Sequence, residues 1–267
     1  MNSLLKLELK RKIQIKKIIS AIIARAICLV ILFSLVLLIK IANGILALFI
    51  SLSVTILLFT PASIINSFIS KSARREIGEL IFTKIKRSPI ILYKLIVSNI
   101  YNIAIILIIN IIIFIFLYDY QKMTPSGIIK ANLVIFVIMI FSSALAIIIV
   151  SLLNRSLIAS SFCAYLIISV LLFSVIIIGP FILITENQKA KDIMTKSALN
   201  VNPVIMLVRS VGKIDIMRTE YMYNVADPIV GRGFAYPDWR IQCLGYFVIS
   251  CLFISVAIVS SSFFLRL

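Results

Sequence analysis

Six long apolar stretches constrain the fold of this chain more than any other feature. They cover residues 18–39, 45–69, 90–118, 130–153, 157–184 and 241–264. Each reaches the length of about 20 residues that a helix needs to cross the hydrocarbon layer of a membrane. Hydrophobic residues fill 62% of the 267 positions, too many for a fold surrounded by water. The sequence therefore predicts an all-α polytopic membrane protein, with six transmembrane helices in a single domain over residues 1–267.

The basic residues between these stretches predict the orientation. Basic residues outnumber acidic ones six to one in residues 1–20 and seven to two in residues 71–94, whereas the opposite loops are near balance. Loops rich in Lys and Arg stay in the cytosol. Both termini and the segment 71–89 are therefore predicted to be cytoplasmic, and residues 185–240 to form an extracytoplasmic loop. We expect the plasma (inner) membrane as the location.

The net charge of +17 is explained by this topology and not by nucleic-acid binding. A nucleic-acid interface needs a folded basic face, and no segment outside the apolar stretches is large enough to build one. The lipid bilayer is therefore the expected partner of the basic segments, and nucleic acid is not.

Two segments outside the apolar stretches show amphipathic patterns. Residues 1–17 place apolar side chains on one helical face among lysines, which is typical of a helix lying in the membrane interface. Arg25 lies near the start of the first stretch and is expected to reach back to the cytosol. Asn202-Pro203 favours a helix start. The apolar stripe that follows predicts a second interfacial helix, and it consists of Val204, Leu207, Val208 and Val211.

Three asparagines occur within the third apolar stretch: Asn99, Asn102 and Asn110. At 100° per residue, Asn99 and Asn110 differ by about 20° around a helix, and Asn102 lies about 60° to one side. The three amides therefore share a face, and polar side chains in lipid turn toward the bundle interior or a cavity. Hydrogen bonds between helices and a transport path are both compatible with this placement.

The residues needed for catalysis are missing from the sequence. It contains no histidine, and its acidic residues all lie outside the apolar stretches. This excludes Ser-His-Asp triads, histidine metal sites and an intramembrane aspartate pair. No P-loop motif is present, and the four cysteines all lie in apolar stretches without disulfide or metal spacing. We therefore expect no enzymatic activity, cofactor or metal in this chain.

The segment 71–89 is a charged insert between the second and third stretches. Glu76 and Glu79 lie near its start and a group of basic residues near its end, which suits the dipole of a helix. Leu80 and Ile81 give this helix an apolar side. Such a helix could dock into a groove on a soluble partner. It could equally be a connector that only anchors two spans at the interface.

The sequence Glu76-Ile77-Gly78-Glu79-Leu80 resembles the coupling segment (E-x-G-T-L type) of exporter-type (type-2) ABC transporter permeases, with Glu79 where threonine is usual. Lys94 resembles the lysine that opens the third span in that family. Leu7-Glu8-Leu9 is similar to its N-terminal amphipathic helix. Asn202-Pro203 and Pro237-Asp238-Trp239 resemble its outer loop and its entry into the last span. The insert is a few residues shorter than usual, and Lys84-Ile85 replaces an apolar-proline step.

The resemblance implies a non-catalytic membrane subunit that exports a substrate. Two such subunits, identical or related, would pair above two P-loop ATPase subunits that bind the ATP and Mg. It implies an ATPase contact through a cytoplasmic coupling helix at Arg74, Arg75, Glu76, Gly78, Glu79 and Leu80. It implies a translocation path or dimer seam at Asn99, Asn102 and Asn110. A non-transporting membrane scaffold and an ATP-independent channel or carrier are the alternatives, and the substrate is not readable from the sequence.

Overall fold

The structure is a computed structural model, and it is helical almost throughout the residues that it describes. These residues are 15–38, 44–82, 87–113, 115, 125–153, 156–172, 184–211 and 238–259. The helices are α2 (Ile15–Leu38), α3 (Gly44–Ile69), α4 (Lys71–Phe82), α5 (Arg87–Ile112), α6 (Pro125–Leu152), α7 (Ser156–Leu172), α9 (Gln188–Asn200), α10 (Pro203–Val211) and α12 (Trp239–Val259). No strand occurs in these described ranges.

Four helices in the described part of the chain are long and apolar enough to cross a membrane: α3, α5, α6 and α12. Shorter apolar segments, Ile22–Leu38 in α2 and Leu157–Ile168 in α7, lie where the first and fifth spans are predicted. The prediction of a helical membrane protein is therefore confirmed, while the count of six spans and the orientation stay predictions.

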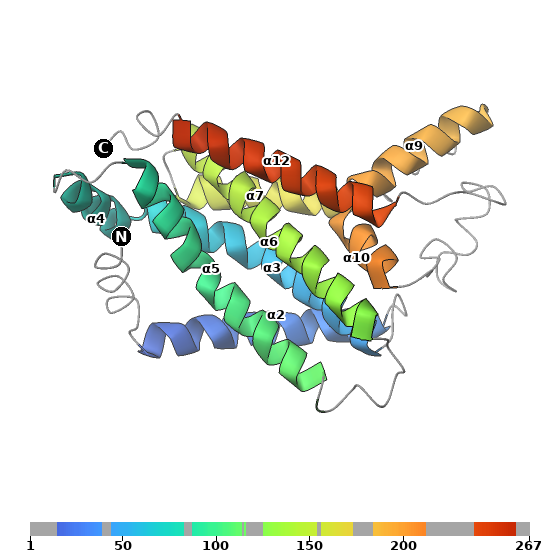
Figure 1. The fold of residues 1–267 in the computed structure, drawn as a ribbon, viewed down its shortest axis with the longest axis horizontal. Coiled ribbons are helices and arrows are strands. Elements are labelled where there is room, and N and C mark those ends of the chain that lie inside the picture. Colours follow the sequence, from blue (N-terminus) through green and yellow to red (C-terminus); the bar gives the residue numbers. More distant parts are fainter. Residues whose placement is uncertain are drawn as a thin grey trace.

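The apolar helices run in alternating directions along one bundle (Figure 1). The start of α2, the end of α12 and all of α4 lie at one end, and α10 lies at the other (Figure 1). This arrangement places α4 and α10 at the two ends of the same helical stack. The interfacial helix predicted for residues 1–17 falls outside the described residues, except for positions 15–17, which begin α2.

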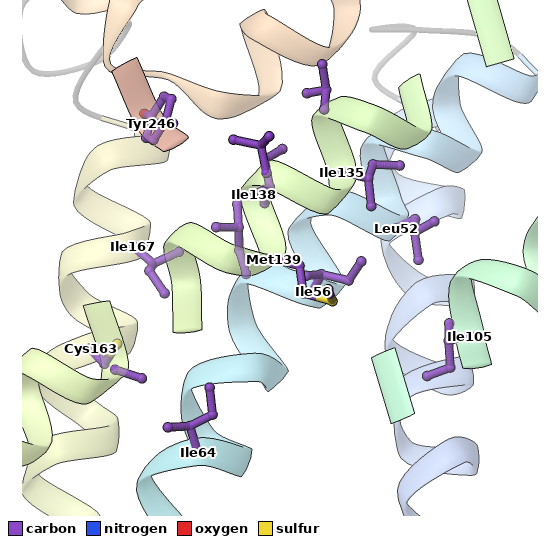
Figure 2. Packing of buried hydrophobic residues seen from close by; sticks show 14 of the residues in the cluster. Leu52, Ile56, Ile64, Ile105, Ile135, Ile138, Met139, Cys163, Ile167 and Tyr246 are labelled. Atoms are coloured by element: carbon purple, nitrogen blue, oxygen red, sulfur yellow. The ribbon is translucent and has the colours of Figure 1, made fainter. Parts of the chain in front are cut away.

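The core of the bundle is the contact between α3 and α6. Helix α3 also contacts α2, α5 and α7, and α6 contacts α12 and α10. Side chains without measurable exposure include Leu52 and Ile64 of α3 and Ile135 of α6, which Figure 2 shows in the packed interior. The surrounding helices turn large apolar side chains outward, for example Leu107 of α5 and Leu252 of α12. An apolar outer surface around an apolar core suits a solvent of lipid.

The apolar stripe of α10 is turned toward protein, while its predicted place at the membrane interface stays a prediction. It packs against α3, α6 and α12 at the end of the bundle away from α4. Ile205, Met206, Leu207 and Val208 are all buried, which leaves no broad apolar face for lipid headgroups. A helical stripe shows only that one face leaves water, and here protein covers that face.

Arg25 also departs from its predicted place. It is 5% exposed, and its guanidinium lies over the ring of Phe59 in α3, 5.4 Å from the ring centroid. The expectation that Arg25 reaches back to the cytosol is therefore wrong. An aromatic face attracts a cation by its quadrupole, and α2 packs along α3, so the side chain turns inward.

Candidate functional site

Helix α4 begins immediately after α3 and turns away from the bundle axis. Only Ser70 separates Ile69, the last residue of α3, from Lys71, the first of α4. The Ser70 hydroxyl accepts a hydrogen bond from the backbone N–H of Ala73 at 3.3 Å. A serine hydroxyl at this position satisfies a backbone donor that the first turn of a helix leaves open. The change of direction thus occurs at Ser70, whose hydroxyl bonds the first turn of the new helix.

One side of α4 is held against the bundle. Ala73 and Ile77 are buried, and Leu80 and Ile81 pack against the core. These contacts reach α3 and α5. The helix is therefore attached to the two spans that it connects.

An ion pair reinforces this attachment. Lys94 Nζ of α5 lies 3.3 Å from Glu76 Oε2 of α4. The Lys94 side chain is 1% exposed, and that of Glu76 is 23% exposed. A charge removed from water to this degree is stable only with a partner. The pair therefore couples the position of α4 to the position of α5.

The opposite side of α4 is open. Arg75 Nε and Glu79 Oε1 lie 3.3 Å apart with side chains 85% and 55% exposed. Phe82, at the end of the helix, is 88% exposed. Aromatic residues and Arg are enriched in protein interfaces, and charged residues such as Glu are found at the rim. We call the set of Arg75, Glu79 and Phe82 the open face of α4.

The six predicted contact residues are thus divided between two sides of the helix. Arg74, Arg75 and Glu79 are exposed, Glu76 and Leu80 are partly buried, and Gly78 is buried. Phe82 was not among them, although its place at the end of the helical repeat from Lys71 and Arg75 could have indicated it.

The predicted asparagine face of α5 turns into the bundle. Asn102 is 1% exposed, and its Nδ2 donates to Thr60 Oγ1 of α3 at 2.9 Å and to Asn99 Oδ1 at 3.2 Å. Asn99 Nδ2 donates to Ser143 Oγ of α6 at 3.0 Å. The two amides therefore join three helices in one layer.

A second amide layer lies farther along α5. Asn110 Nδ2 donates to Asn132 Oδ1 of α6 at 2.8 Å, and Asn132 Nδ2 donates back to Asn110 Oδ1 at 2.7 Å. The sequence reasoning missed Asn132 and Ser143. An amide inside the fourth apolar stretch was a signal of the same kind as those in the third.

A row of buried polar residues on α5 runs from the ion pair to the first asparagine layer, although Ser98 Oγ in its middle has no hydrogen-bond partner among the described residues. Lys94, Ser98 and Asn102 are each 1% exposed and are spaced four residues apart on α5. Residues at this spacing lie one above another on a helix. Motion of α4 would therefore act on α5 at Lys94. The other end of this row of polar residues, Asn102, donates a hydrogen bond to Thr60 of α3.

Among the described residues, no group of three or more Cys, Asp or Glu is close enough to hold a metal ion. No family model, curated protein or solved structure matches this chain. The chemistry of the site thus rests on its own geometry: a helix fixed on one side, open on the other, and linked to buried polar contacts within the bundle.

Proposed function

We propose that this chain is the membrane-spanning permease subunit of an exporter-type ABC transporter. It exports a substrate across the plasma membrane with ATP hydrolysed by separate P-loop ATPase subunits. Two permease copies, identical or related, form the membrane part. The proposal joins the sequence resemblance around Glu76–Leu80 to the geometry of α4.

The attachment of α4 is the observation that supports the proposal most. Its buried side and the Glu76–Lys94 pair attach it to α3 and α5. The side chains of its open face are exposed and are not covered by the other described helices. A rigid helix of this kind transmits force, because displacement of the open face moves both attached spans. A soluble motor on the α4 side could therefore drive the bundle through this single element.

The geometry also refines the roles that the resemblance implies. Because Glu76 is paired with Lys94 of α5, we assign the contact with the ATPase to the open face of α4. Phe82 is the apolar anchor of that contact, and Arg75 and Glu79 supply its charge pattern. Asn99, Asn102 and Asn110 hold the moving helices together, and a path or dimer seam would have to open beside them.

Exchange of two open-face side chains tests the proposal. We expect a soluble P-loop ATPase to co-purify with the tagged chain when the chain is purified in mild detergent from its own host. Glu79→Lys with Phe82→Ala should reduce that ATPase at least about tenfold, because alanine removes the aromatic anchor that the partner would cover and lysine reverses the charge at position 79. The measurement is the ATPase-to-permease ratio by quantitative mass spectrometry.

A matched control is available at the other end of the bundle. Glu186→Lys with Ile193→Ala makes the same charge reversal and a comparable truncation of an apolar side chain at exposed positions near and on α9, and it should leave the ratio unchanged. Equal ATPase recovery with both double variants, or no P-loop ATPase with the unaltered chain, contradicts the proposal. Stimulation of the complex by candidate substrates then separates a transporter from a scaffold.

A further inference from the structure

The hydrogen-bond ladder of α3 is interrupted in the half of the helix that leads to α4. Pro61 lies at this point. Proline has no backbone N–H, so the carbonyl of Leu57, one turn earlier, receives no bond from position 61. Sharp bends in long helices occur mostly at such a point. The residues from Leu57 to Pro61, which we call the proline turn, are therefore easier to bend than the rest of α3.

Two neighbouring helices contact the proline turn. The guanidinium of Arg25 in α2 lies over the ring of Phe59, 5.4 Å from its centroid. Asn102 of α5 donates a hydrogen bond from Nδ2 to Thr60 Oγ1 at 2.9 Å. Phe59 and Thr60 are the two residues directly before Pro61. The turn that lacks a backbone bond is therefore braced by side chains from both α2 and α5.

The hydroxyl of Thr60 is used differently from other hydroxyls of the same helix. Ser51, Thr55 and Ser67 each donate to a carbonyl of α3 itself. Thr60 is 0% exposed and accepts its hydrogen bond from another helix. A hydrogen bond between helices favours one relative position of the two, which a bond within one helix does not. Thr60 therefore ties the proline turn to α5.

This tie extends to α6, the core partner of α3. Asn102 Nδ2 also donates to Asn99 Oδ1 at 3.2 Å, and Asn99 Nδ2 donates to Ser143 Oγ of α6 at 3.0 Å. Asn102 is 1% exposed and Ser143 is 3% exposed, so protein surrounds these bonds. The proline turn is thus held in place relative to both α5 and α6.

The part of α3 beyond the proline turn leads directly into α4. Residues 62–69 continue the helix to Ser70, whose hydroxyl accepts from the backbone of the first turn of α4. Figure 1 shows α4 at this end of the bundle. A displacement of α4 therefore passes along residues 62–69 and reaches the proline turn, where the helix bends most easily.

We infer that the proline turn is a hinge in α3, and that Asn102, through Thr60, limits how far it bends. While the Asn102–Thr60 bond holds, residues 62–69 and α4 keep one position relative to α6. When the bond is lost, they swing about Pro61. This inference goes beyond the proposed function, because it concerns the backbone of α3 and requires no ATPase.

The distance between α4 and α6 reports the bending. With Cys28, Cys163, Cys243 and Cys251 replaced by alanine, spin labels are attached at Arg75→Cys and Leu152→Cys, both at exposed positions. The full chain is reconstituted in lipid nanodiscs with an excess of unlabelled chain, so that the measured distance lies within one copy. Pulsed electron paramagnetic resonance then gives the width of the distance distribution.

Two adjacent substitutions should change this width in opposite directions. Thr60→Val removes the acceptor of Asn102 at nearly constant shape, so the distribution should become about one and a half times wider. Pro61→Ala restores the backbone bond to Leu57, so it should become about a third narrower. Thr55→Val is the matched control: this buried hydroxyl bonds only its own helix, and the width should not change.

Two further variants separate a hinge from a general loss of packing. Thr60→Ser keeps the acceptor and should retain the width of the unaltered chain. Thr60→Val combined with Pro61→Ala should be as narrow as Pro61→Ala alone, because a helix with an intact ladder does not need the brace. Equal widths for Thr60→Val and Thr55→Val, an unchanged width in Pro61→Ala, or the full widening by Thr60→Val in the combined variant overturn the inference.

Discussion

Replacing Glu76 by glutamine is expected to destabilise the chain far more than replacing Glu79 by glutamine. Glu76→Gln takes the carboxylate away from Lys94, whose side chain is 1% exposed. Loss of one partner from a buried ion pair costs about 3–5 kcal/mol. Glu79 pairs with Arg75 in solvent, where an ion pair contributes about 0–1 kcal/mol. The measurement is thermal unfolding of the detergent-purified chain.

Replacement of the other partner, Lys94, should destabilise the chain less than Glu76→Gln does. Lys94→Met leaves the charge on Glu76, which is 23% exposed and can regain water by a small movement. Glu76→Gln combined with Lys94→Met removes both charges and should recover most of the loss, because a buried pair is only weakly stabilising relative to neutral side chains. Equal costs for Glu76→Gln and Glu79→Gln, or strictly additive costs in the double variant, contradict a buried coupling pair.

Substitution of one asparagine in the second amide layer is the other large expected effect. Asn110→Leu leaves the amide of Asn132 without its two reciprocal hydrogen bonds. We expect a loss of about 1–2 kcal/mol, the upper range for polar contacts between helices in lipid. Asn132→Leu should cost a similar amount, and the double leucine variant should cost less than the sum.

This double-mutant cycle separates the two roles left open for the asparagines. If the amides pack the helices together, the unfolding temperature falls in each single variant, and the double variant loses less stability than the sum of the two single losses. If they line a path, the single variants keep their stability and change only transport or ATPase stimulation. Asn66→Leu, at an exposed position of α3, is the control for the chemical change itself. Unaltered stability in both single variants contradicts packing.

The helices and the polar face of α5 could be predicted from the sequence because both depend on local periodicity. Apolar length fixes where a membrane helix occurs, and the 100° step places the asparagines on one side. The pair between Glu76 and Lys94 could not be predicted in this way. It requires the fold to bring α4 back onto α5, which a spacing of eighteen residues does not specify.

The burial of α10 and of Arg25 escaped prediction for a related reason. An apolar stripe indicates that one face of a helix is shielded from water, but either lipid or protein can cover that face. A cation near the end of a span can reach either the headgroups or an aromatic ring, and the ring of Phe59 comes from another helix. Contacts between distant segments decide both cases.

The central claim is that the open face of α4 meets a nucleotide-driven partner. A photo-crosslinking phenylalanine analogue placed at Phe82, activated in membranes of the native host, tests it most directly. The same analogue at Phe162, which is 45% exposed on α7, is the control for random collision and lipid attachment. The account predicts one protein adduct specific to position 82, with a soluble P-loop ATPase. Adducts with lipid alone, or the same products from both positions, would contradict it.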